Sequence, residues 1–274
     1  MSGATEIFTV KKVGASQTGT ATDTLAVEEP LEINIVFGPT EKRIKKKVSV
    51  TMRTPGNDGE LAVGFLFTEG IIRTKEDVLR VTSDTLNVVV IEVREDVVPT
   101  IETLDRNFYT TSSCGVCGKA SLDAVRIKSA FTPANNTSTF QADLLHTLEQ
   151  KLRKSQQVFS STGGLHASGI FDRQGNMVLV REDVGRHNAL DKVIGTALMN
   201  GNLPLTTSIL LLSGRISFEL MQKAYMAGIP IVTAIGAPSS LAVTFAEECG
   251  MTLVGFVREN RYTIYAGQHR IVQP

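Results

Sequence analysis

The sequence predicts an α/β protein with an α+β N-terminal part and a C-terminal part built on parallel strands. Two observations carry this prediction. Early in the chain, short runs alternate apolar with polar residues, as half-buried strands do. Late in the chain, continuous apolar runs alternate with helix-like segments, and strands buried on both faces of a parallel sheet have this continuous pattern.

Three sections are expected along the 274 residues of the chain. Residues 1–24 show little pattern and predict an N-terminal arm or edge strand. Residues 25–135 form the α+β domain, which ends in a loop that carries two cysteines. A stretch rich in Ala, Pro, Asn, Ser and Thr between Ser129 and Thr139 indicates a linker, so the α/β domain spans residues 136–274.

The α+β domain begins with strand patterns. Residues 31–37 and 48–52 alternate apolar with polar positions and predict an antiparallel pair, with the charged run 42–47 in the turn region between them. Residues 80–83 and 87–93 predict two further strands.

A helix is expected between these strand pairs, over residues 58–69. Asn57 and Glu60 have the spacing of a capping box at its start. Gly70 is the residue type that commonly ends a helix, so it marks the C-terminus.

The second domain opens with a helix, a hairpin and another helix. Leucines at helical spacing predict a helix over residues 141–154. Residues 170–171 and 177–180 flank a turn-like segment and predict a hairpin. An amphipathic helix over residues 188–199 follows, and Gly201 ends it.

The last part of the chain has the clearest order, a strand–helix–strand–helix–strand pattern. This pattern indicates parallel strands joined by right-handed crossovers. The predicted strands are residues 208–212, 230–235 and 252–257, the helices are residues 218–227 and 240–249, and residues 262–265 add an edge strand.

Composition excludes several classes of protein. Lysine plus arginine total 28 and aspartate plus glutamate total 28, so no protein-wide attraction to nucleic acid is expected. The basic run 42–47 is typical of a solvated hairpin. The chain begins with no export signal and has no apolar run of about 20 residues, the length that spans a membrane. We therefore expect a cytoplasmic protein with no membrane and no nucleic-acid partner.

The pair Cys114 and Cys117 is the most informative motif, and four chemistries compete for it. A zinc site normally has four ligands, yet the chain adds only the distant Cys249 and four scattered histidines, which argues against zinc. A thioredoxin-like redox pair would be expected early in the chain, opening a helix after a strand. Two buried structural cysteines are the third alternative.

The fourth chemistry is a nucleophilic thiol on an exposed loop. Gly115 and Gly118, with serines before the pair, are typical of a loop and not of a packed element. Lys119 would favour the thiolate, which is the reactive form. These residues favour the nucleophile, while the alternatives stay open.

The cysteine loop resembles that of the formate dehydrogenase accessory sulfurtransferase family (FdhD), and the likeness extends from about residue 25 to the C-terminus. Several long blocks in the family's order make this resemblance specific, whereas one CxxC would be weak. The matching blocks are residues 53–60 (RTPGNDGE), 112–118 (SSCGVCG), 162–167 (TGGLHA), 181–192 (REDVGRHNALDK) and 213–215 (SGR).

The resemblance implies a sulfurtransferase that carries sulfur from a cysteine desulfurase to the molybdenum cofactor of formate dehydrogenase. Cys114 and Cys117 are the implied catalytic residues, with a persulfide on Cys114. The cargo is implied to be the bis-molybdopterin guanine dinucleotide cofactor, and a homodimer is expected. The implied cofactor-binding segment comprises Phe256, Val257, Arg258, Glu259, Asn260 and Arg261. Guanidinium groups suit its pyrophosphates because they bind them in a bidentate manner.

The family is also similar in fold to cytidine deaminases, so the C-terminal domain is expected to share that fold without its zinc site. Deaminases hold zinc with H-x-E and P-C-x-x-C. This chain has His166 followed by Ala167 and Ser168, and Ser213–Arg215 at the later turn, without the Glu or the thiolates. His166 and the turn could still line a nucleotide cleft, with Gly214 and Arg215 near a helix N-terminus.

Asp183, Arg186 and His187 precede a predicted helix and are expected to have structural roles. Cys249 stands beside a helix stop and is expected to be a buried small apolar residue. Two alternative functions remain at this point. One is a chaperone that binds the cofactor without transferring sulfur, and the other is a dithiol oxidoreductase.

Overall fold

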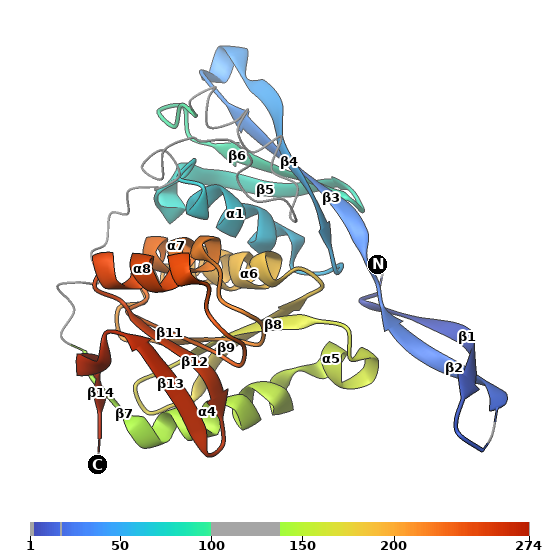
Figure 1. The fold of residues 1–274 in the computed structure, drawn as a ribbon. Coiled ribbons are helices and arrows are strands. Elements are labelled where there is room, and N and C mark those ends of the chain that lie inside the picture. The colour runs from blue at the N-terminus through green and yellow to red at the C-terminus, as the bar shows by residue number, and fades with distance from the viewer. Residues whose placement is uncertain (1–2, 17, 100–137, 274) are drawn as a thin grey trace.

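The computed structural model describes residues 3–16, 18–99 and 138–273. Two sheets lie on either side of a layer of helices, and further helices cover the outer face of the larger sheet (Figure 1). The expected α/β class is confirmed. The expected boundary near residue 135 lies outside the described residues.

In the part of the chain that the structure describes, the smaller sheet contains four strands in the order β4-β3-β6-β5. Its strands are β3 (Glu29–Phe37), β4 (Ile44–Arg53), β5 (Val78–Thr85) and β6 (Val88–Val93). The predicted antiparallel pair β3–β4 is confirmed, and β3 runs parallel to β6. The charged run was expected in the turn, but Ile44 pairs with Phe37 and begins β4, so four of the six residues of that run lie in the strand.

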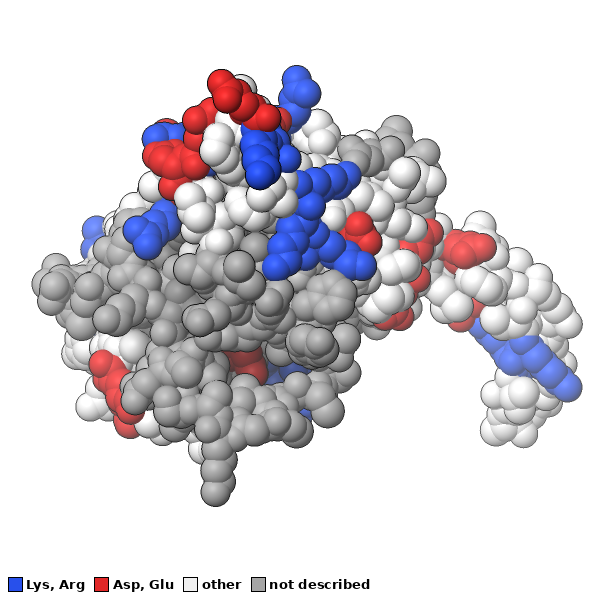
Figure 2. Space-filling model, turned by 90° about the horizontal axis from the view of Figure 1, so that it is seen from above, with Lys and Arg blue, Asp and Glu red and all other residues white. Residues whose placement is uncertain are grey.

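The basic side chains of this sheet have acidic neighbours. Arg43 lies 3.3 Å from Glu92, and Lys47 lies 3.6 Å from Glu32. Figure 2 shows basic and acidic side chains in adjoining patches on this face. The run is therefore a charge-balanced strand edge, as expected for a solvated segment.

Helix α1 (Asp58–Thr68) begins where the sequence predicts, but without the predicted capping box. Asn57 has a left-handed backbone conformation, with φ 59°, and its side chain does not cap the helix. Glu60 instead forms an ion pair with Arg181 of the other sheet, at 2.6 Å. A contact distant in sequence thus replaces the local cap. Gly70 ends the helix region with a positive φ of 71°, as predicted.

The larger sheet contains six strands from the described residues, in the order β13-β12-β11-β10-β8-β9. These are β8 (His166–Phe171), β9 (Met177–Asp183), β10 (Ile209–Leu212), β11 (Ile231–Ala234), β12 (Thr252–Arg258) and β13 (Arg261–Ala266). The predicted parallel strands β10, β11 and β12 are confirmed, as are the β8–β9 hairpin and the edge strand β13. Strand β8 pairs antiparallel with β10, which the sequence did not indicate.

Helices cover both faces of this larger sheet (Figure 1). Between the sheets lie α6 (Arg186–Met199), α7 (Phe218–Met226) and α8 (Ser240–Glu248). The outer face carries α4 (Ala142–Ser155) and the short α5 (Gln157–Thr162). Helix α4 buries Leu145, Leu148 and Leu152 against this face. The predicted helices α4, α6, α7 and α8 are confirmed, whereas α5 was not predicted.

Short elements complete the described fold. Strand β7 (Phe140–Gln141) pairs in parallel with β14 (Ile271–Val272), which places the C-terminal end beside the start of α4. The 3₁₀ turns are η1 (Thr40–Lys42), η2 (Lys75–Asp77) and η4 (Gln268–Arg270).

Helices α1 and α6 cross at two glycines. A Cβ atom on Gly64 would lie 1.9 Å from the Asp191 carbonyl oxygen, and one on Gly195 would lie 1.9 Å from that of Glu60. The backbones therefore touch at this crossing. One apolar core continues through it, from the smaller sheet to the inner face of the larger sheet.

Two buried ion pairs reinforce the junction between the sheets. Asp183 lies 2.7 Å from Lys192, and neither side chain is more than 2% exposed. Lys192 also donates to the Thr54 carbonyl oxygen at 2.9 Å. In the second pair, Lys223 lies 3.0 Å from Asp191. The expected structural role of Asp183 is therefore observed.

A hairpin projects from the body of the protein (Figure 1). It consists of β1 (Thr5–Val13) and β2 (Thr18–Ala26), which among the described residues pair only with each other. Ile7 and Val13 are 72% and 73% exposed. The arm expected at the N-terminus is therefore this projecting hairpin. No helix among the described residues is long and apolar enough to cross a membrane.

Candidate functional site

Two adjoining cavities open on the α4 side of the larger sheet, beyond the carboxyl ends of its parallel strands. One has a volume of about 510 Å³ and is lined by the β12–β13 turn. The other has a volume of about 660 Å³ and is lined by α4, α5 and the ends of β10 and β11. Glu149 of α4 lines both. Ligands of open α/β sheets bind at this edge, so the two cavities form the candidate site.

The turn between β12 and β13 supplies the first cavity. Arg258 and Arg261 are paired across the hairpin, and Glu259 and Asn260 form the turn between them. All four residues line the cavity. They are four of the six residues that the resemblance implied for the cofactor.

The other two implied residues lie just before the turn. Val257 is fully buried in the outer core, whereas Phe256 is 42% exposed. Phe256 has a positive φ of 53°, at an irregularity in the strand pairing between Gly255 and Arg258. Its backbone N–H donates to the Gly236 carbonyl oxygen at 3.2 Å, which holds β12 against the loop after β11.

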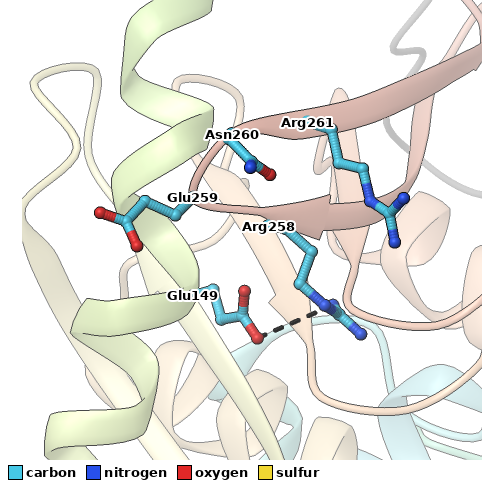
Figure 3. Close-up of a pocket in the computed structure, with 5 residues that line it drawn as sticks. All are labelled: Glu149, Arg258, Glu259, Asn260 and Arg261. Atoms are coloured by element: carbon cyan, nitrogen blue, oxygen red, sulfur yellow. Dashed lines mark ion pairs between the residues drawn. The ribbon is translucent and has the colours of Figure 1, made fainter.

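Arg258 is fixed by three partners. Its Nη1 atom donates to the carbonyl oxygens of Ile235 at 3.0 Å and Val257 at 2.7 Å, and lies 3.7 Å from Glu149. Figure 3 shows the guanidinium groups of Arg258 and Arg261 extending to the same side of the turn. Two cations side by side suit an anion with several oxygens, such as a diphosphate.

The wall of the second cavity combines a stacked pair with a buried amide. The Arg153 guanidinium carbon lies 4.1 Å from the centre of the Phe159 ring. Gln156, at the junction of α4 and α5, is 3% exposed, and its buried Nε2 atom has no hydrogen-bond partner among the described residues. All three residues line the cavity. Sequence reasoning missed them because it did not predict α5, and their spacing also fits an ordinary amphipathic helix.

His166 lies at another part of the same wall, beside the Ser213–Gly214 turn. Burial, then the nearby Arg186 charge, lowers the pKa of His166. Burial, with the charges of Lys223 and Arg186, lowers the pKa of His187 to about 4. Both imidazoles are therefore neutral at pH 7 and leave the positive charge of the region to its arginines and lysines.

The remaining predicted residues are placed as follows. Cys114 and Cys117 lie outside the described residues. Arg215 is exposed and is not among the residues lining either cavity. Arg186 and His187 lie in the first turn of α6 and not before it. Cys249 was expected to be buried; it is half-buried at the end of α8, where it packs against the main core.

The backbone at Phe256 yields a stability prediction. A left-handed φ costs an ordinary L-residue about 1–2 kcal/mol, which glycine avoids, and β-branched residues tolerate it least. Phe256→Val is therefore expected to be less stable than Phe256→Gly by about 1–2 kcal/mol, measured by urea unfolding. Equal stability of the two variants would show that the left-handed backbone at residue 256 imposes no strain.

Comparisons with known proteins identify the family of this chain and agree with its fold. The model of the FdhD/NarQ family matches residues 26–272. A Mycolicibacterium paratuberculosis protein named "Sulfur carrier protein FdhD" is 51% identical over 271 residues, covering 96% of this chain and 97% of that protein. A protein of the same name from Streptomyces avermitilis is 47% identical, covering 99% and 97%.

A solved structure supports the same fold. It is that of a Desulfotalea psychrophila protein assigned as a formate dehydrogenase accessory protein, and it aligns with a TM-score of 0.76. The alignment covers 98% of this chain and all of that one at 20% identity, so it bears on the fold alone. The family model and the curated relatives, which match nearly the whole chain, define the class of this α/β protein with an arginine-bearing cavity at its strand ends. The chain belongs to the FdhD/NarQ family.

Proposed function

We propose that this chain is a sulfur carrier required for formate dehydrogenase activity. It accepts sulfur from a cysteine desulfurase as a persulfide on Cys114 and passes it to the molybdenum cofactor before the cofactor enters the enzyme. The observation that carries the proposal is the match to the FdhD/NarQ family over residues 26–272, a span that includes both cysteines. The sulfur carriers named above match nearly their whole length.

The chemistry requires two thiols. The outer sulfur of a persulfide is formally zero-valent, whereas a sulfido ligand is sulfide, so its delivery consumes two electrons. The Cys117 thiolate would attack the Sγ atom of Cys114, forming a disulfide, and the outer sulfur would leave with the electron pair of the broken S–S bond. A thiol reductant must then supply two electrons to reopen the disulfide.

The cargo proposed is the bis-molybdopterin guanine dinucleotide cofactor, which carries two diphosphate links. Arg258 and Arg261 fit these links because their guanidinium groups extend to one side of the turn, beside the first cavity. The segment Phe256–Arg261 is thus proposed as the binding element for the phosphates. Phe256 and Val257 would position the turn and not touch the cargo.

Two further proposals follow from family membership. The chain would act as a homodimer, and the projecting hairpin with its exposed apolar residues is a surface that a partner could cover. The domain of residues 136–274 would share the cytidine deaminase fold. Its mixed sheet, with helices on both faces, is compatible with that fold.

Sulfur loading tests the carrier role directly. The protein is incubated with a cysteine desulfurase and cysteine, and its peptides are mapped by mass. We expect a gain of one sulfur on the peptide containing Cys114, lost in Cys114→Ala and retained in Cys117→Ala. Cys249→Ala is the matched control and should load normally. No sulfur gain on the wild-type peptide would refute the proposal.

Activation of a formate dehydrogenase separates the carrier from a chaperone that binds the cofactor without transferring sulfur. The chaperone is favoured by one observation: the described residues that line the two cavities include the turn arginines and no cysteine. A carrier loses activation in Cys114→Ala and in Cys117→Ala. A chaperone retains activation in both variants and loses it in Arg258→Ala. An oxidoreductase would turn over protein disulfides and have no affinity for the cofactor.

A further inference from the structure

We infer that two copies of this chain join through strand β1, the first strand of the projecting hairpin. The β1 strands of the two copies pair antiparallel about a two-fold axis at Thr9, so the two hairpins form one continuous sheet. The inference rests on the proposed homodimer, and it assigns to that dimer a strand, a register and a symmetry. The occupant of the open edge is therefore a second copy of this chain.

The hairpin has an edge that is open in a single copy. Strands β1 and β2 pair without a register shift along their whole length, and β1 pairs with no other strand among the described residues. Its sequence, TEIFTVKKV, contains no proline. An unbroken edge strand of this kind is a template for a further strand. A two-stranded hairpin is also only marginally stable in water, whereas a sheet of three or more strands with an apolar face is stable.

The backbone pairing shows which groups of β1 face the open edge. The Val27 N–H donates to the Ala4 carbonyl oxygen at 2.9 Å, so these two residues, just beyond the strand ends, form a hydrogen-bonded pair. Hydrogen-bonded and non-hydrogen-bonded pairs alternate along an antiparallel ladder. The even-numbered residues of β1 therefore bond to β2. The odd-numbered residues, from Thr5 to Val13, direct their N–H and C=O groups to the open edge.

A two-fold axis restricts the register of this pairing. The axis stands perpendicular to the sheet, and residues that face each other across it point to the same side of the sheet. Facing residues must then both have odd numbers or both have even numbers. With the axis at Thr9, all nine residues of β1 are paired. An axis at Phe8 or at Val10 is also allowed, but it leaves two residues at one end of each strand unpaired.

The register centred on Thr9 places complementary side chains opposite each other. Glu6 faces Lys12 of the second copy and Phe8 faces Val10 of the second copy, and the symmetry makes each pairing occur twice. These even-numbered pairs are the non-hydrogen-bonded ones, in which the side chains lie closest. Opposite charges and apolar pairs in this position stabilise a sheet. An axis at Phe8 would place Glu6 opposite Val10, and an axis at Val10 would place Lys12 opposite Phe8.

The pairing also covers apolar surface that a single copy leaves in water. Phe8 is 43% exposed and Ile7 is 72% exposed. Lys12 lies 3.6 Å from Asp23 in an exposed ion pair, and an ammonium has three donors, so Lys12 can keep this partner and also bind Glu6 of the second copy.

The shape of the molecule leaves room for this arrangement. The hairpin extends away from the body (Figure 1). In the antiparallel pair the tip of one hairpin lies beside the root of the other, so the two bodies lie at opposite ends of the shared sheet. Nine residues from each copy are fewer than the roughly 20–30 residues a side of a standard interface, so a dissociation constant in the micromolar range is expected.

The oligomeric state of the full-length protein tests the inference, measured by sedimentation velocity over a range of concentrations with a thiol reductant present. The test variant is Thr9→Pro. Because the Thr9 N–H points to the open edge, proline there spares the ladder with β2 and blocks the second copy. It should weaken dimerisation by about a hundredfold or more.

The matched control is Thr22→Pro. Thr22 is the partner of Thr9 in β2, so its N–H points away from β1, and proline there leaves the open edge of β1 intact. This variant should dimerise as the wild type does. Far-ultraviolet circular dichroism and thermal unfolding establish that both variants are folded.

A charge exchange tests the register. Glu6→Lys places like charges opposite each other at two points, so it should weaken dimerisation by about tenfold, and added salt should reduce this effect. Combining Glu6→Lys with Lys12→Glu restores opposite charges and should recover most of the loss. The register is wrong if the combined variant dimerises no better than Glu6→Lys alone.

The outcomes separate this inference from the proposed function. If Thr9→Pro and Thr22→Pro dimerise equally, whether as well as the wild type or not at all, the open edge of β1 is not the interface, and the proposed homodimer stands. If the wild-type protein is a monomer at all concentrations, the interface and the homodimer both fall. Sulfur loading of Cys114 tests the carrier role independently of these results.

Discussion

Asp183→Asn is expected to lower the free energy of unfolding by about 3–5 kcal/mol, because it leaves the Lys192 ammonium buried without its counter-charge. Asp183 is fully buried and also accepts hydrogen bonds from the backbone N–H groups of Thr54 at 3.2 Å and Gly185 at 2.8 Å. Asparagine preserves the shape of the side chain but replaces one accepting oxygen with a donor, so the loss combines the charge with one backbone hydrogen bond. Denaturant unfolding provides the free energy.

A double-mutant cycle completes this test. Adding Lys192→Met to Asp183→Asn removes the stranded charge, so the double variant should be more stable than Asp183→Asn alone. Asp23→Asn is the exposed control, since Asp23 and Lys12 are 46% and 61% exposed at 3.6 Å, and it should cost under about 1 kcal/mol. If Asp183→Asn costs as little as Asp23→Asn, the buried pair does not stabilise the junction.

Gly195→Ala is expected to destabilise the protein by about 3 kcal/mol or more. This value is at the upper end of the range for substitutions that overpack a core. The added Cβ atom would lie 1.9 Å from the Glu60 carbonyl oxygen, and the nearest atoms are backbone atoms that cannot rotate aside. Helices α1 and α6 would have to separate, which opens the core between the two sheets. The expected readout is a lower denaturant midpoint.

Gly19→Ala is the control for this substitution. Gly19 lies in the projecting hairpin, where an added Cβ atom would have no neighbour within 4 Å, so alanine should change stability by less than about 0.5 kcal/mol. A small effect of Gly195→Ala would show that the helices can part at little cost.

Patterns that repeat locally made most of the fold predictable. The continuous apolar run at residues 209–212 is buried as predicted, and so are Leu145, Leu148 and Leu152 of α4, because continuous apolar runs and apolar residues at helical spacing are local signals of burial. The arginines of the β12–β13 turn were likewise identified before their cavity was known, through their resemblance to a family segment.

Contacts between distant segments were not predictable from the sequence. Glu60 has the spacing of a cap, yet its carboxylate binds Arg181, 121 residues away, so a tertiary ion pair replaced a local hydrogen bond. Gln156 belongs to no recognisable sequence motif. Its buried amide nitrogen has no hydrogen-bond partner among the described residues, and only the three-dimensional structure reveals this.

The structure explains two of the sequence blocks on which the family resemblance rests. Residues 53–60 and 181–192 lie far apart in sequence, but they meet through Glu60 with Arg181 and through Thr54 with Asp183 and Lys192. Together they join the smaller sheet to the larger one. Their sequence is therefore explained, at least in these contacts, by the architecture and not by sulfur chemistry.

The anchoring of Arg258 has a consequence for binding. An unrestrained arginine side chain loses rotamer entropy when it binds a ligand, and this loss weakens association. Arg258 is already held by two carbonyl oxygens and Glu149, so that loss occurs during folding. The turn is thus preorganised, and an anion that reaches it meets a cation with few remaining degrees of freedom.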